Sequence, residues 1–268
     1  MSTESSFADR LYSVGQYLYR GPLKPVVRKS GAERAYKRLL VHLMKRQTIS
    51  VGEVAATFAI DTPEELFHLK NNFKKERKTL HEFVSNIQPD DVVYDIGANV
   101  GVYACLAGKK VIDGSTVAFE PASYNAAKIS QNADANDVEV DVHEVALSRS
   151  NGEAEFVMDE RGVAGSGHGS LKEQTNKSLM IKIRTGNSLV ERGECPAPTV
   201  VKIDVEGAEL EVIEGLDHSL EDPRCREIFV EVHPDHVPPS TVQERLEELG
   251  FQVSDGEATN RTHLYGSK

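Results

Sequence analysis

The chain of 268 residues contains no Trp, only three Cys and no long apolar run. A membrane-spanning helix needs about 18 or more consecutive apolar residues, so we expect none. The first residues also lack the basic-then-apolar pattern of a signal peptide. Cys105, Cys195 and Cys225 are too widely spaced for a C-x-x-C metal site, and their odd number argues against a disulfide framework. These absences predict a cytoplasmic protein.

Negative charge outweighs positive charge over the chain as a whole, with 42 Asp and Glu against 31 Lys and Arg, but one segment is strongly basic. The net charge is −11, which argues against a general nucleic-acid binder. Residues 10–46 nevertheless hold ten Lys or Arg and one acid, with apolar residues between them. Such a basic amphipathic segment can lie on an anionic membrane, here the inner face, as a peripheral contact. The alternative interpretation is that it packs on the rest of the chain and pairs with its acids.

The apolar pattern changes along the chain. Residues 1–85 predict a basic, mainly helical region with a short hairpin at 49–60 and one long helix over 61–87. From residue 92, short strands rich in Val and Ile alternate with helices, which predicts a Rossmann-like α/β fold with a mostly parallel sheet covered on both faces. The pair Asn151-Gly152 is typical of a tight hairpin turn. We therefore divide the chain into 1–85 and 86–268.

A cofactor site is indicated where the strand in "VVYDIGANVGV" ends. Asp95 closes that strand, and Gly97 and Gly101 follow it. Ligands of open α/β sheets bind at the carboxyl ends of strands, but this loop lacks the G-x-G-x-x-G that brings backbone against a pyrophosphate. An acid here repels phosphate and suits an amino-bearing cation. The loop therefore predicts S-adenosylmethionine as the cofactor, with an NAD-linked oxidoreductase as the alternative.

Later strands also end in acids. Glu120 closes the second strand, 25 residues after Asp95, where a carboxylate can accept from both ribose hydroxyls. By the same layout Glu144 and Val145 lie beside the adenine, unless Glu144 is simply an exposed loop acid. Asp204 ends the fourth strand, toward which the transferred methyl group should point.

The chain resembles the FkbM-type family of S-adenosylmethionine-dependent O-methyltransferases. The resemblance covers about residues 90–235 and rests on "YDIGANVGVY", "FEP", "VALSRSNGEAEF", "KIDVEGAELEVIEGL" and "FVEVHP". It implies the class I methyltransferase sheet of seven strands with the last one antiparallel. It also implies that Asp204 lies by the reaction centre and that the cofactor is held by Asp95, Gly97, Ala98, Asn99, Gly101, Glu120 and Pro121. Family members methylate hydroxyls of varied acceptors, including macrolides and sugars.

Methyl transfer to a hydroxyl needs alignment of the reacting atoms and a base for the proton. We predict that Asp204, Glu206 and His233 lie nearest the methyl group, although His233 is also explained as a turn residue before Pro234. A divalent metal held by Asp204 with neighbouring acids is an open alternative, but no metal-binding motif supports it, so we assign no metal ligand from the sequence. The expected acceptor is a hydroxyl of a sugar or glycan, lipid-linked glycans included, or of a secondary metabolite. A non-catalytic binding protein is the remaining alternative.

Overall fold

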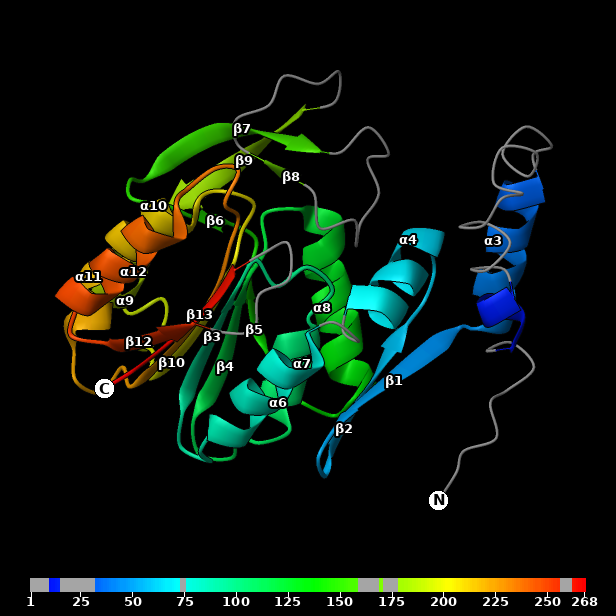
Figure 1. Cartoon of the computed structure of the whole chain (residues 1–268), viewed down its shortest axis with the longest axis horizontal. Helices are drawn as coiled ribbons and strands as arrows, with labels where there is room; N and C mark the ends of the chain where they lie inside the picture. The colour runs from blue at the N-terminus through cyan, green and yellow to red at the C-terminus, as the bar shows by residue number, and fades with distance from the viewer. Residues whose placement is uncertain (1–9, 15–31, 73–75, 159–168, 171–177, 256–261) are drawn as a thin grey trace.

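A computed structural model describes residues 10–14, 32–72, 76–158, 169–170, 178–255 and 262–268 (Figure 1). A central sheet carries helices on both faces, and a smaller sheet lies above it in this view. Among the described residues, no helix has the length and apolar character needed to cross a membrane.

The central sheet has seven strands in the order β12-β13-β11-β10-β3-β4-β5. Its members are β3 (Val92–Ile96), β4 (Ser115–Phe119), β5 (Asp141–His143), β10 (Val200–Asp204), β11 (Glu227–Val232), β12 (Gln252–Asp255) and β13 (Thr262–Ser267). The strands pair in parallel, except that β13 is antiparallel to both of its neighbours. The predicted class I methyltransferase sheet is therefore confirmed.

Two hydrophobic clusters fill the space on either side of the sheet. Along β3, Val93 packs into one cluster, whereas Tyr94 and Ile96 pack into the other. The first cluster lies under α6 (Arg77–Asn86), α7 (Val102–Gly108) and α8 (Ser123–Ala135). The second lies under α9 (Gly186–Glu191), α10 (Glu209–Gly215), α11 (Asp217–Glu221) and α12 (Pro239–Glu248). Both faces of the central strands are buried, which explains their near-continuous apolar sequences.

The first part of the chain combines helices with the expected hairpin. It contains α3 (Ala32–Leu43), β1 (Arg46–Val51), β2 (Val54–Ala59), α4 (Pro63–Phe67) and the π-helical turn η1 (His68–Asn72). Antiparallel pairing of β1 with β2 confirms the hairpin. A capping box of Thr62 and Glu65 starts α4. The single helix predicted over 61–87 is wrong, because α4 passes into η1 and α6 begins separately at Arg77.

The hairpin is tied to the central sheet through α8. The side chain of Asn132 accepts from the amide of Ala59 at 3.1 Å. Asn136 accepts from the Thr57 amide and donates to the Thr57 carbonyl, at 2.7 and 2.9 Å. Fully buried Leu40 and Phe58 share one cluster with Val93 of the central sheet. The two predicted regions thus pack as one body in the described residues, and the division at 85/86 stays a prediction.

The smaller sheet has the order β6-β9-β7-β8. Its strands are β6 (Ala146–Leu147), β7 (Gly152–Met158), β8 (Gly169–Ser170) and β9 (Ser178–Arg184). The predicted hairpin turn at Asn151-Gly152 is wrong, because β6 and β7 lie on opposite sides of β9. Asn151 instead accepts hydrogen bonds from the Thr185 amide and the Ser188 hydroxyl. The sheet begins just beyond the carboxyl end of β5, where ligands of this architecture bind.

Candidate active site

The strand order reverses between β3 and β10, and the loop after β3 lies at that switch point. Gly97, Asn99 and Gly101 all have positive φ, at 75°, 52° and 80°. A Cβ on Gly97 would come within 2.0 Å of the Asp204 carbonyl oxygen, and one on Gly101 within 3.0 Å of Ile129. Both glycines are therefore required by their backbone conformation and by close packing.

Asp95 is fully buried beneath this loop. Its Oδ2 accepts from the Ala104 amide at 3.0 Å, and its Oδ1 lies 3.1 Å from Lys202 Nζ. Burial raises the pKa of Asp95, and the Lys202 ammonium partly offsets this. The sequence predicts that Asp95 faces a cationic ligand, whereas in the described chain Lys202 is a cation beside it. Direct contact of Asp95 with the cofactor stays a prediction.

Glu120 lies at the end of β4 with only 6% of its surface exposed. Its two oxygens accept from the amides of Asn99, at 2.9 Å, and Ala122, at 3.0 Å. These bonds leave further lone pairs on the carboxylate, which has about four acceptor sites. Burial raises the pKa of Glu120 to about 7. The residue thus joins the loop after β3 to the start of α8, with acceptor capacity left for a ligand.

The other predicted cofactor residues lie along the same edge. Ala98 is buried, and its amide donates to the Phe119 carbonyl at 3.2 Å. Pro121 directly follows Glu120 and is half-buried. Glu144 is exposed and accepts from the Ser123 hydroxyl, whereas Val145 is half-buried against the hydrophobic cluster under α9–α12. The contacts of Glu144 and Val145 with adenine stay predictions.

The three predicted catalytic residues meet at the ends of β10 and β11. His233 Nε2 lies 3.4 Å from Glu206 Oε2, and ligand atoms of His233 and Asp204 lie within 4.8 Å of each other. His233 is buried, and its Nδ1 is 2.5 Å from Glu209 Oε1. Burial acts to lower the pKa of His233, but the bond to Glu209 and the charges of Glu206 and Asp204 outweigh it and raise that pKa.

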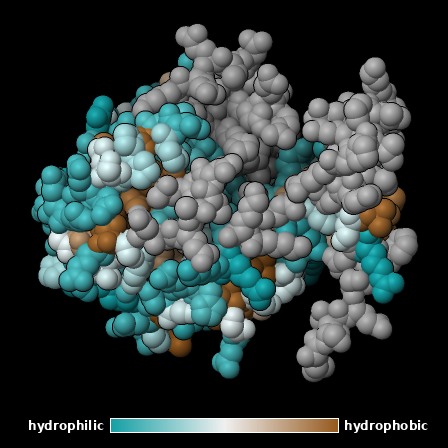
Figure 2. All heavy atoms as spheres, viewed as in Figure 1, coloured by the Kyte–Doolittle hydropathy of each residue, from teal (hydrophilic) through white to brown (hydrophobic). Residues whose placement is uncertain are grey.

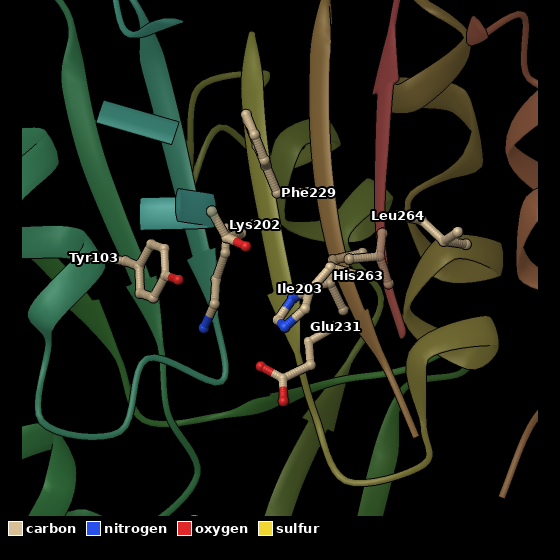
Figure 3. Close-up of a pocket in the computed structure, with 9 residues that line it drawn as sticks. Tyr103, Lys202, Ile203, Phe229, Glu231, His263 and Leu264 are labelled. Carbon is tan, nitrogen blue, oxygen red and sulfur yellow. The ribbon is translucent and has the colours of Figure 1, made fainter. Parts of the chain in front are cut away.

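Three buried charged residues of this site are not predicted from the sequence. Lys202 lies 3.1 Å from Asp95 and 3.7 Å from Asp204, and its Nζ is 4.9 Å from the centre of the Tyr103 ring. Glu231 and Glu209 complete the surroundings of His233. The available signal was a charged residue inside an otherwise apolar strand, in "VVKID" and "EIFVEV". Figure 3 shows Tyr103, Lys202 and Glu231 lining one small cavity.

Comparison with known proteins identifies the family of this site. Residues 95–253 match the family described as the methyltransferase FkbM domain. The chain belongs to the FkbM methyltransferase family. Hexuronic acid methyltransferase AglP of Haloferax volcanii is 33% identical over 74% of this chain and 78% of its own length. The 31-O-demethyl-FK506 methyltransferase FkbM of Streptomyces tacrolimicus is 26% identical over 55% of this chain and 67% of its own.

Among solved structures, an FkbM methyltransferase from Methylobacillus flagellatus aligns with a TM-score of 0.49 and 14% identity, over 74% of this chain and 52% of that one. FkbM membership makes the chain an S-adenosylmethionine-dependent O-methyltransferase. The NAD-linked and non-catalytic alternatives are therefore set aside.

The described residues fit S-adenosylmethionine. Glu120 retains acceptor capacity for ribose hydroxyls, and the buried Asn99 Oδ1 has no hydrogen-bond partner within the described part of the chain. When bound, the cofactor supplies a methyl group activated by a sulfonium. The residues that would hold it are those of the loop from Asp95 to Gly101, together with Glu120.

Proposed function

We propose that the enzyme methylates an oxygen of a sugar, with a glycan containing a uronic acid as the acceptor class. The observation that carries the proposal is the meeting of Asp204, Glu206 and His233 beside the cofactor loop. The acceptor class is supported by the relative named as a hexuronic acid methyltransferase, which is 33% identical to this chain. A secondary metabolite is the competing acceptor class.

The site residues have distinct roles in this proposal. The acceptor oxygen must lie in line with the methyl carbon and the sulfur, since the new C–O bond forms as the C–S bond breaks. The electron pair of the broken bond stays on sulfur. For a hydroxyl acceptor, the proton passes to a carboxylate of the cluster. Asp204 is more exposed than Glu206, with 30% of its side chain accessible against 19%. Lys202 holds Asp204 in place from 3.7 Å.

A transfer assay with radiolabelled S-adenosylmethionine tests the acceptor class. The acceptors are an oligosaccharide that ends in glucuronic acid and a matched one that ends in glucose. We expect label to enter the first at a much higher rate. Alkali then distinguishes the product, because a methyl ester is hydrolysed and a methyl ether is not. Equal labelling of both sugars, or label in neither while the cofactor binds, would contradict the uronic-acid proposal.

We further infer a peripheral membrane contact for α3, at the cytoplasmic side. Leu40 of this helix and Met44, directly after it, are buried against the body of the protein, whereas Leu39 and Leu43 are 47% and 42% exposed. Arg38 and Lys45 are also exposed. Figure 2 shows brown and teal atoms side by side at the right of the view, where Figure 1 places α3. A lipid-linked glycan would then lie near the enzyme.

Sedimentation with anionic liposomes at low salt tests this contact. Each cation near such a surface contributes about 1 kcal/mol. The double variant Arg38→Glu, Lys45→Glu should therefore sediment less than the wild-type protein. Absence of the wild-type protein from the liposome pellet would leave the competing interpretation, in which the basic segment only packs on the protein.

A further inference from the structure

Asp204, Glu231 and His233 form a cluster with the composition of a metal site. They come from the ends of the neighbouring strands β10 and β11, and one ligand atom from each lies within 4.8 Å of the others. Two carboxylates and one imidazole can hold a divalent cation and leave positions open for water or substrate. Glu231 plays no part in cofactor binding as described above, so its place in the cluster needs an explanation.

The setting of His233 is a second, independent indication. The residue is only 6% exposed, and its Nε2 makes no hydrogen bond within the described part of the structure, although Glu206 Oε2 lies 3.4 Å away. The other ring nitrogen, Nδ1, lies 2.5 Å from Oε1 of fully buried Glu209. Metal-bound histidines almost always donate their second N–H to such a carboxylate, which fixes the ring and directs the free nitrogen at the ion. Glu209 therefore places Nε2 as a ligand atom.

The charge around the cluster favours a cation as well. Five carboxylates gather at this end of the sheet, close to Lys202 and His233, namely Asp95, Asp204, Glu206, Glu209 and Glu231. A uronic acid would bring a further negative charge into this site. A bound divalent cation would offset the excess and could bridge the protein carboxylates to the acceptor.

We propose that Asp204, Glu231 and His233 bind a divalent transition-metal ion that holds the acceptor oxygen in line with the methyl group. This role of the ion rests on the proposed function, and the sequence by itself assigns no metal ligand. The imidazole ligand disfavours Mg²⁺ and Ca²⁺, which prefer oxygen ligands alone, whereas carboxylates suit Mn²⁺. Mn²⁺ is therefore the probe.

Titration of the chelator-treated full-length protein with Mn²⁺, followed by electron paramagnetic resonance, tests the site without cofactor or acceptor. We expect one bound ion per chain. Glu231→Gln should weaken Mn²⁺ binding by about a hundredfold or more, and Glu209→Gln by about ten- to a hundredfold. The matched control is Glu214→Gln, because Glu214 is a partly exposed acid of α10 that pairs with Arg149. It should bind Mn²⁺ as the wild type does.

A measurement on the unmutated protein covers the case in which a variant fails to fold. Electron spin-echo modulation from a ligating nitrogen should appear in the wild-type Mn²⁺ complex and disappear in His233→Gln. The proposal is overturned if Mn²⁺ does not bind, if Glu231→Gln and Glu214→Gln bind it equally, or if no nitrogen coupling is seen. Mn²⁺ binding without methyl transfer to any sugar would leave the metal site standing and reject only the proposed acceptor.

Discussion

Glu120 is the residue on which the cofactor site can be tested most directly. Glu120→Gln keeps the size of the side chain and one carbonyl acceptor but removes the charge shared with the amides of Asn99 and Ala122. We expect the affinity for S-adenosylhomocysteine to fall by about 2 kcal/mol, or about thirtyfold, in calorimetry. Glu139→Gln alters an exposed acid and should change nothing. Equal affinity in both variants would show that Glu120 does not bind the ribose hydroxyls.

The raised pKa of Glu120 also gives the cofactor affinity a pH dependence. Its carboxyl loses its proton only near pH 7 in the folded chain, although its ordinary pKa is 4.5. Between these values the folded state holds a proton that the unfolded state has lost, so the contribution of Glu120 to stability falls as pH rises through this window. The ionised form accepts from both ribose hydroxyls. The affinity for the cofactor should therefore rise as pH increases through about 7. Calorimetry at about one pH unit below and about one unit above this value measures the change.

The variant Glu120→Gln serves as the control for this pH dependence. Its side chain does not titrate, so its affinity should stay flat over the same range. A wild-type affinity that falls with rising pH would reverse the predicted sign and reject Glu120 as the titrating group.

Asp204→Asn separates chemistry from cofactor binding. The change keeps the shape of the side chain and removes the charge, as needed to test a base or a metal ligand. Turnover should fall at least about a hundredfold, whereas cofactor affinity should change little, because Asp204 lies at the acceptor side of the site. Rates with saturating sugar and cofactor measure the effect. Near-normal turnover would shift the role of base to Glu206.

The sequence predicts the site residues that follow the ends of strands, but not the buried ones that surround them. Asp204 and His233 follow apolar strands, so the layout of the sheet predicts that they meet. Glu231 lies between two Val residues in β11, and the period of two in a strand shows which face it is on but not that this face is buried at that point. Glu209 sits in the first turn of α10, where an acid is also explained by the helix dipole. Only the packing shows that it contacts His233.

At the scale of elements, a substitution that adds one methyl group can test the contact between the loop after β3 and the end of β10. Gly97→Ala would place Cβ within 2.0 Å of the Asp204 carbonyl oxygen and hold Ala at a φ of 75°. Gly193→Ala is the matched control, since its φ is 68° and nothing lies within 4 Å. The control should lose about 1–2 kcal/mol of stability from φ alone. In thermal unfolding, Gly97→Ala should lose clearly more stability than the control. A similar loss in both variants would show that the structure adjusts to the added methyl group at little cost.

Helices and strands were predicted well where the hydrophobic pattern of the sequence determines them. They were predicted poorly where contacts with distant parts of the chain determine them. The alternation of strands and helices from residue 92 is confirmed, because the strands β3, β4, β10 and β11 are each long enough and apolar enough to be recognised in the sequence. Asn151-Gly152 has the local signature of a hairpin turn, yet the Asn151 side chain bonds to Thr185 and Ser188 far along the chain. Likewise, the periodicity over 61–87 does not reveal the π-helical turn η1.

At the scale of the whole molecule, the hairpin β1–β2 should be needed for folding. Removing residues 1–60 would leave the buried amides of Asn132 and Asn136 without their partners in β2, at about 1–3 kcal/mol each. It would also uncover the cluster that contains Phe58. The shortened chain should therefore melt at a much lower temperature by circular dichroism. An unchanged melting temperature would show that residues 61–268 fold without the hairpin β1–β2.

The close approach of Gly97 to Asp204 also bears on how acceptor preference can diversify. The close backbone contact between Gly97 and Asp204 sets the distance between the cofactor loop and the end of β10. A substitution that moves one of these segments would therefore also move the other. Variation in acceptor must then come from segments outside this rigid pair. The small sheet β6–β9 meets that condition, because it grows from the end of β5 and contributes none of the residues assigned here to cofactor or chemistry. We therefore predict that transplanting residues 152–184 between relatives transfers acceptor preference and leaves cofactor affinity intact.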